Sequence, residues 1–202
     1  QQRCGDAVRF GVRPGTFLRN RAALALAAGE GGVETGMGIA RDLQGAFLFG
    51  GHRPLLWILC GDWLLQRGDP VGAAACYRKA TGWPQTAADA WNGLGEALFA
   101  QDALRSAQEA FERALALRPQ DPWILNNAGV VLRARGDLAL AADRFAAAHR
   151  AAPELFEPRF NLGLTHEQAG RMARARYWYT RAAELRPDFP PVRDRLRALG
   201  DQ

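Results

Sequence analysis

The side chains best suited to chemistry in this 202-residue chain are three histidines and three cysteines. Histidine serves proteins as a general base or a metal ligand, and a cysteine thiolate serves as a nucleophile or a metal ligand. His52, His149 and His166 are isolated along the chain, without an HExxH pattern or a Cys/His cluster. No G-x-S-x-G elbow or dinucleotide fingerprint occurs either. The sequence therefore predicts no enzymatic activity, no metal and no cofactor.

The cysteines Cys4, Cys60 and Cys76 have neither metal-ligand spacing nor the pattern of a disulfide framework. A Cys60–Cys76 bridge is compatible with the sequence, but spacing alone cannot establish the geometry that a disulfide needs. The glycine-rich stretch 29–38 lacks a terminal lysine and a preceding strand, so we expect a flexible connector rather than a phosphate-binding loop.

The elements that carry these residues recur every 34 residues, most clearly around the stretch from Trp91 to Pro119. Four columns keep their residue type in all four copies: a glycine, an alanine, an aromatic residue and a second alanine. These columns are Gly61, Gly95, Gly129 and Gly163; Ala73, Ala107, Ala141 and Ala175; Tyr77, Phe111, Phe145 and Tyr179; and Ala80, Ala114, Ala148 and Ala182. The small columns predict close helix crossings, with large residues, the aromatic column among them, filling the space to either side.

The repeat closely resembles the tetratricopeptide repeat, over about two thirds of the chain. The matching residues are Trp91, Leu94, Gly95, Ala107, Phe111, Ala114 and Pro119, with Leu98 where the family prefers tyrosine. The resemblance implies an all-α fold, a right-handed α-solenoid of helix-turn-helix repeats at 54–87, 88–121, 122–155 and 156–189. Because one such repeat cannot bury its apolar face alone, the repeats are expected to stack on one another.

The two ends of the array are expected to be caps. In residues 1–53 we expect an arm followed by two helices, at 16–28 and 39–48. Their apolar residues lie 34 positions before those of the first clear repeat, as in a degenerate fifth repeat. They should cover the helix from Leu55 to Leu65, which is apolar nearly all round. In residues 190–202 the apolar residues Val192, Leu196 and Leu199 recur at helical spacing, and this pattern predicts a C-terminal capping helix.

The net charge of +5 is concentrated near the C-terminus, where residues 171–197 contain eight arginines against three acidic residues. Such an end could contact nucleic acid, an anionic membrane or an acidic partner, but a solvated final helix is the favoured interpretation. No recognition motif accompanies the charge, so we expect no nucleic-acid partner. The most apolar region, 43–65, is interrupted by His52, Arg53, Pro54 and Asp62, so no membrane insertion by this segment is expected.

The family resemblance implies that the first helix of each repeat lines a concave groove that binds a peptide or protein segment. The groove residues that it implies are Leu55, Ile58, Asp62, Asn92, Glu96, Phe99, Trp123, Asn126, Asn127, Val130, Arg133, Phe160 and Asn161. Asparagine there can both donate to and accept from an extended peptide backbone. Asn126 and Arg133 lie outside the repeated columns, so their replacement is expected to leave the fold intact.

These observations predict a non-catalytic adaptor that holds a protein partner. The abundance of alanine and glycine, with Lys79 as the single lysine, suggests a bacterial genome, and hence a bacterial assembly on the cytoplasmic or periplasmic side of the membrane. The alternative is a soluble repeat domain of a larger membrane-anchored or cell-envelope protein. It is motivated by the start without methionine and by the apolar N-terminal half.

Overall fold

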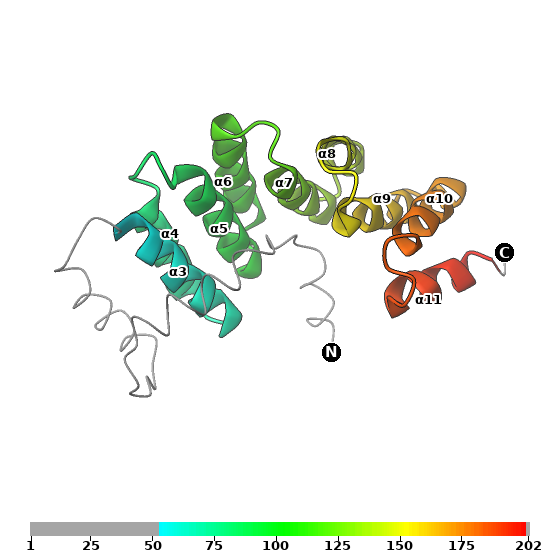
Figure 1. Cartoon of the computed structure of the whole chain (residues 1–202), viewed down its shortest axis with the longest axis horizontal. Coiled ribbons are helices and arrows are strands. Elements are labelled where there is room, and N and C mark those ends of the chain that lie inside the picture. Colours follow the sequence, from blue (N-terminus) through cyan, green and yellow to red (C-terminus); the bar gives the residue numbers. More distant parts are fainter. Residues whose placement is uncertain (1–52, 201–202) are drawn as a thin grey trace. The chain divides into compact units, whose positions relative to one another are not determined.

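The computed structural model describes residues 53–200, which form nine α-helices and no strands (Figure 1). The helices are α3 (Arg53–Gln66), α4 (Pro70–Ala80), α5 (Ala87–Ala100), α6 (Leu104–Leu117), α7 (Pro122–Ala134), α8 (Leu138–Ala151), α9 (Phe156–Gln168), α10 (Met172–Ala183) and α11 (Pro190–Ala198). The predicted all-α fold is confirmed. The helices predicted at 16–28 and 39–48 lie outside the described residues.

The helices belong to two compact units, one ending at Arg118 and the other beginning at Pro119. In the first unit, α4 packs against both α3 and α5, and α6 packs against α5. In the second unit, α8 packs against both α7 and α9, while α10 packs against α9 and α11. Each unit therefore contains stacked helix pairs, in which α4 and α8 each cover the first helix of their own pair and that of the next pair.

The turn between the two helices of each pair contains one residue in the left-handed region, again at 34-residue spacing. Gly68, Gly136 and Gly170 have φ of 79°, 88° and 71°, and Asp102 has φ of 61°. Glycine adopts this conformation without steric cost, and aspartate tolerates it better than most residues because its short side chain is polar. Glycine and aspartate are typical turn residues, so the sequence itself predicts a turn at each of these four positions, and the structure confirms all four.

Two helices begin with the same combination of aspartate and proline. Asp69 accepts a hydrogen bond from the Gly72 amide at 2.9 Å at the start of α4. Asp121 accepts one from the Trp123 amide at 3.1 Å at the start of α7. An aspartate at this position satisfies amide groups that the helix leaves unpaired, and the following proline is preset for the first turn.

The glycine column makes room for the aromatic column. The nearest neighbours of a Cβ built on each glycine would be ring atoms of the same repeat's aromatic residue. The shortest distances are 2.6 Å for Gly61 to Tyr77, 2.7 Å for Gly95 to Phe111, 2.6 Å for Gly129 to Phe145 and 2.4 Å for Gly163 to Tyr179. The expectation that the aromatic residues lie to either side of the crossing is wrong, because each ring lies directly over its glycine.

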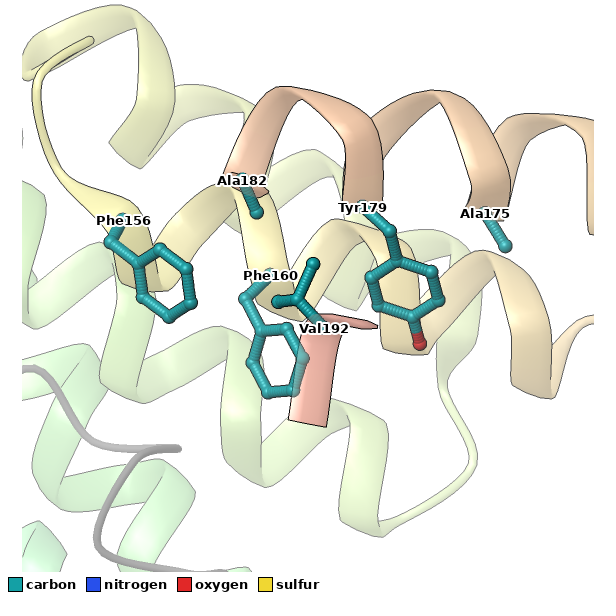
Figure 2. Packing of buried hydrophobic residues seen from close by; sticks show 6 residues of the cluster. All are labelled: Phe156, Phe160, Ala175, Tyr179, Ala182 and Val192. Atoms are coloured by element: carbon teal, nitrogen blue, oxygen red, sulfur yellow. The ribbon is translucent and has the colours of Figure 1, made fainter. Parts of the chain in front are cut away.

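Helix α11 covers one side of α9 and α10 with its apolar residues. Val192 is fully buried and lies beside the ring of Phe160 in a cluster that also contains Phe156 and Tyr179 (Figure 2). Leu196, Leu199 and Phe189 pack against the same cluster. The amphipathic pattern predicted for this helix is thereby confirmed.

The apolar helix α3 is buried on some faces and open on another. Ile58 and Leu59 are buried, whereas Leu55 is 49% exposed. The residues predicted to cover this helix lie outside the described part of the chain, so the N-terminal cap stays a prediction.

Candidate functional site

The predicted groove residues lie on the first helix of each pair. Helix α3 carries Leu55, Ile58 and Asp62; α5 carries Asn92, Glu96 and Phe99; α7 carries Trp123, Asn126, Asn127, Val130 and Arg133; and α9 carries Phe160 and Asn161. The first two helices belong to one compact unit and the last two to the other, so the two faces are described separately.

On α3 and α5, the polar groove residues are held by hydrogen bonds. Asp62 accepts a hydrogen bond from the hydroxyl of Tyr77 at 2.6 Å. Burial raises the pKa of Tyr77 well above its usual value, and the charge of Asp62 raises it further, so the hydroxyl stays protonated as a donor. One turn apart on α5, the side-chain amide of Asn92 donates to Glu96 at 2.7 Å.

The second position of two repeats holds an acidic residue that is paired within its own repeat. Asp89 forms a bidentate ion pair with Arg118, in which the two guanidinium nitrogens donate to the two carboxylate oxygens at 2.8 and 2.9 Å. Glu157 pairs with Arg186 at 3.2 Å across the same interval of 29 residues. The other two repeats have Leu55 and Trp123 at this position. These acidic groups therefore help to fix the end of the second helix of the repeat.

On α7 and α9, three asparagines form one buried row. The amide of Asn161 donates to the side-chain oxygen of Asn126 at 2.9 Å, and the Asn126 amide donates to Asn127 at 3.4 Å. At most 1% of each residue is exposed. Asn126 lies outside the repeated columns, but its burial and its bond to α9 make it part of the packing between these helices. These contacts argue against the expectation that its replacement leaves the fold intact.

The remaining groove residues of this unit divide between surface and core. Trp123 and Arg133 are partly exposed, whereas Val130 is fully buried. Phe160 is buried in the cluster beneath α11, where its ring lies 5.7 Å from that of Phe189. Of the predicted groove residues on α7, Trp123 and Arg133 are thus the two whose side chains reach the surface.

One polar contact that the sequence did not suggest ties α9, α10 and α11 together. The hydroxyl of Tyr179 donates to Glu167, and the guanidinium of Arg195 binds the other oxygen of the same carboxylate. Burial and this hydrogen bond raise the pKa of Tyr179. The aromatic column could have predicted this contact, because its two tyrosines, unlike its two phenylalanines, each need a hydrogen-bond partner for the buried hydroxyl.

The two described histidines lie in packed surroundings. His166 is buried, and its burial together with Arg174 and Arg171 lowers its pKa. His149 lies edge-on to Trp178 at 5.4 Å between ring centroids, and its burial is the main cause of its lowered pKa. Among residues 53–200, no three histidine, cysteine or acidic side chains gather into a group that could hold a metal ion.

The arginine-rich end is partly neutralised by ion pairs. Of its eight arginines, four contact a carboxylate: Arg181 with Glu184, Arg186 with Glu157, Arg195 with Glu167 and Arg197 with Asp194. All four arginine side chains remain substantially exposed, so each pair contributes little to stability. Glu157 and Glu167 lie outside residues 171–197, so these two carboxylates reduce the excess positive charge of that stretch below the sequence count. Within the described range, no helix combines the length and hydrophobicity needed to cross a bilayer.

Comparison with known proteins agrees with the repeat pattern. A family model described as tetratricopeptide repeat matches residues 88–121, the bounds predicted for the second repeat. A second model of the same description matches residues 126–190. No match was found among curated proteins.

Solved structures with the same fold include PilF of Pseudomonas aeruginosa, which is 27% identical with a TM-score of 0.69. The match covers 73% of this chain and 68% of PilF. A crystal structure of MamA matches at 22% identity and a TM-score of 0.64, covering 73% of this chain and 86% of MamA. MamA from Desulfovibrio magneticus, from residue 41 to its end, matches at 20% identity and a TM-score of 0.63, covering 75% and 91%. At these lower identities the two MamA structures show the fold alone.

Proposed function

Because the chain belongs to the tetratricopeptide repeat family, we propose that it is a non-catalytic scaffold whose first helices bind a peptide or protein segment. A repeat array offers an extended surface made of equivalent helix faces, which suits recognition of another chain rather than catalysis. The proposed binding face in the second unit is formed by α7 and α9, and its accessible residues include Trp123 and Arg133.

The observation that carries this proposal is the hydrogen bond from Asn161 to Asn126. It joins the first helices of two successive repeats at 2.9 Å, which supports a continuous face across α7 and α9. A continuous face built from successive first helices is what an extended partner segment would require. The asparagine row makes this face rigid, and a rigid face loses less conformational freedom when a partner binds.

The exposed groove residues indicate the chemistry of the partner. Trp123 offers a large aromatic surface and Arg133 carries a positive charge, and tryptophan and arginine are residue types that contribute most at protein interfaces. The acidic residues Asp89 and Glu157 are already paired with arginines. We therefore propose a partner segment with an apolar anchor for Trp123 and an acidic side chain that complements the charge of Arg133.

We further propose that the partner belongs to a bacterial assembly, since PilF, which is 27% identical to this chain, comes from the bacterium Pseudomonas aeruginosa. The alternative, a repeat domain of a larger membrane-anchored or envelope protein, is favoured by the apolar helix α3, on which Leu55 is 49% exposed. The open reading frame upstream of Gln1 distinguishes the two proposals.

The binding face is tested by selecting peptides from a display library on the full chain and measuring their affinity by fluorescence anisotropy. We expect the double variant Trp123→Ala, Arg133→Ala to weaken binding by about tenfold or more, as the loss of two anchor residues does. Circular dichroism shows whether this variant keeps its helices.

A matched control replaces one apolar residue and one arginine on a second helix of the same unit. Leu140→Ala with Arg144→Ala removes exposed side chains of the same kinds from α8. Affinity within about twofold of wild type is expected for this control. A loss of binding in the α8 control, with binding by the α7 variant unchanged, would place the binding face on the second helices instead.

A further inference from the structure

The two described cysteines face each other across the first helix pair. The Sγ of Cys76 on α4 lies 2.9 Å from the Sγ of Cys60 on α3, and both residues are buried free thiols. This separation exceeds the S–S bond length of about 2.05 Å by less than about 1 Å. The helices α3 and α4 are joined by a short turn, so a small shift within one hairpin would bring the sulfurs to bonding distance.

Packing alone does not call for a cysteine at either position. In the next repeat, 34 residues further along, the equivalents of Cys60 and Cys76 are Leu94 and Ala110, both buried. In the other two repeats they are Ala128 and Arg144, and Leu162 and Trp178. The first described repeat is thus the one in which two thiols meet, and a leucine–alanine pair fills the same space in its neighbour.

The surroundings of the pair favour a thiolate beside a thiol. The Cys76 thiol donates a hydrogen bond to the Cys60 sulfur, which lowers the pKa of Cys60, while burial opposes that shift. The positive charge of Lys79 also lowers the pKa of Cys60. The Lys79 ammonium lies 4.2 Å above the ring of Trp57. Lys79 is on α4 and Trp57 is on α3, so this cation–π contact lies within the same helix pair. A thiolate is the form of cysteine that attacks oxidants.

We propose that Cys60 and Cys76 are an oxidative modification site, at which a small hydroperoxide converts the dithiol into a disulfide that joins α3 to α4. With hydrogen peroxide, one thiolate attacks a peroxide oxygen, the O–O bond breaks, and a sulfenic acid and hydroxide form. The second sulfur then attacks the sulfenic sulfur, forming the S–S bond and releasing water. Two thiols and one peroxide thereby give one disulfide and two waters. A thiol reductant reverses the change.

The disulfide would limit local opening of this helix pair. In a repeat array, stability depends on each repeat and its neighbours, so single repeats can open independently of the rest. A cross-link between residues 16 apart removes conformational freedom mainly from the open state, and so makes opening less favourable. We therefore expect amide hydrogen exchange in α3 and α4 to slow by on the order of 100-fold on oxidation, with little change in α5 and α6.

The test uses the full chain with Cys4→Ser, so that Cys60 and Cys76 are its two thiols. After treatment with stoichiometric hydrogen peroxide, tryptic digestion is expected to give peptides 42–67 and 68–78 linked by a disulfide. Their mass should be two hydrogen atoms below the sum of the separate peptides. Dithiothreitol should separate them and restore the original rate of hydrogen exchange.

The matched control is Cys60→Leu with Cys76→Ala, which introduces the pair found in the next repeat. Its hydrogen exchange in α3 and α4 should not respond to peroxide. If this variant does not fold, Cys76→Ala alone serves the same purpose. The proposal is overturned if peroxide leaves both thiols free for alkylation, or if it converts one cysteine to sulfinic acid without linking the peptides. Equal slowing of exchange in the control would also overturn it.

Discussion

The ring of Phe145 occupies the space that a side chain on Gly129 would need. A Cβ at Gly129 would lie 2.6 Å from Cε1 of that ring, closer than real contacts allow. Phe145 is fully buried there. A glycine in a helix costs about 1 kcal/mol in helix propensity, but at this position it allows a whole aromatic side chain to be buried. The same relationship holds in all four repeats, which makes the glycine–aromatic pair the unit that sets how closely the two helices of a repeat pack.

Replacing Gly129 with leucine should therefore destabilise the protein. The new side chain has no room unless the ring of Phe145 moves, and overpacking of this kind costs about 1–3 kcal/mol. Urea denaturation followed by circular dichroism at 222 nm measures the change in the free energy of unfolding. The double variant Gly129→Leu, Phe145→Ala completes a double-mutant cycle. We expect Gly129→Leu to cost less in the Phe145→Ala background, and an additive pair would contradict the steric argument.

The turn column predicts a different effect of losing a glycine. A Cβ at Gly136 would meet nothing within 4 Å, but its φ of 88° is unfavourable for any residue with a side chain. Gly136→Ala should cost about 1 kcal/mol through backbone strain alone. At the equivalent position Asp102→Gly removes that strain, so it should be neutral or slightly stabilising. A stabilised Gly136→Ala variant in thermal denaturation would disagree with the observed turn conformation.

Asn126 should behave as a core residue. Asn126→Ala leaves the Asn161 amide without its 2.9 Å acceptor in a buried site, and an unsatisfied buried group costs about 1–3 kcal/mol. The comparison is Asn92→Ala, which removes a partly buried side chain whose bond to Glu96 spans one helical turn. We expect the smaller loss for Asn92→Ala in chemical denaturation. The reverse order of stabilities would show that the asparagine row is not a structural element.

The hydroxyl of Tyr77 should contribute to stability through Asp62. Tyr77→Phe keeps the ring against Gly61 but removes the 2.6 Å hydrogen bond to the carboxylate. Hydrogen bonds to charged groups contribute most, so a loss of about 1–2 kcal/mol is expected. Tyr177→Phe removes a hydroxyl from a residue that is 53% exposed and should change the melting temperature little. Equal effects of the two substitutions would exclude a special contribution from Asp62.

The lowered pKa of His166 predicts that acid destabilises the protein. Burial and the charges of Arg174 and Arg171 disfavour the protonated form in the folded state. As the pH falls through the unfolded value of about 6.5, the unfolded chain takes up a proton that the folded chain does not, so the free energy of unfolding falls. Above about pH 6.5 this contribution is fully present. His166→Gln should show a smaller loss of stability than wild type between about pH 7.5 and pH 5.5. An unchanged pH dependence would assign the effect to other groups.

The sequence alone determined the all-α fold, the repeat spacing and the turns, because these depend on residue type at fixed intervals. A left-handed turn needs glycine or a tolerant residue at one position, and Gly68, Asp102, Gly136 and Gly170 mark that position without any tertiary information. The tetratricopeptide repeat family followed from the same columns.

Contacts between columns were decided by the tertiary structure. A one-dimensional pattern shows that Gly129 and Phe145 are each constant in type, but not that the ring lies over the glycine. It places Asn126 on the groove face, while the neighbouring helix decides that this side chain is buried against Asn161. Likewise, sequence spacing left the Cys60–Cys76 bridge open, and only the packing of α3 on α4 sets their sulfurs 2.9 Å apart. Distance and burial depend on how two helices cross, and that angle is a property of the packed pair rather than of either helix.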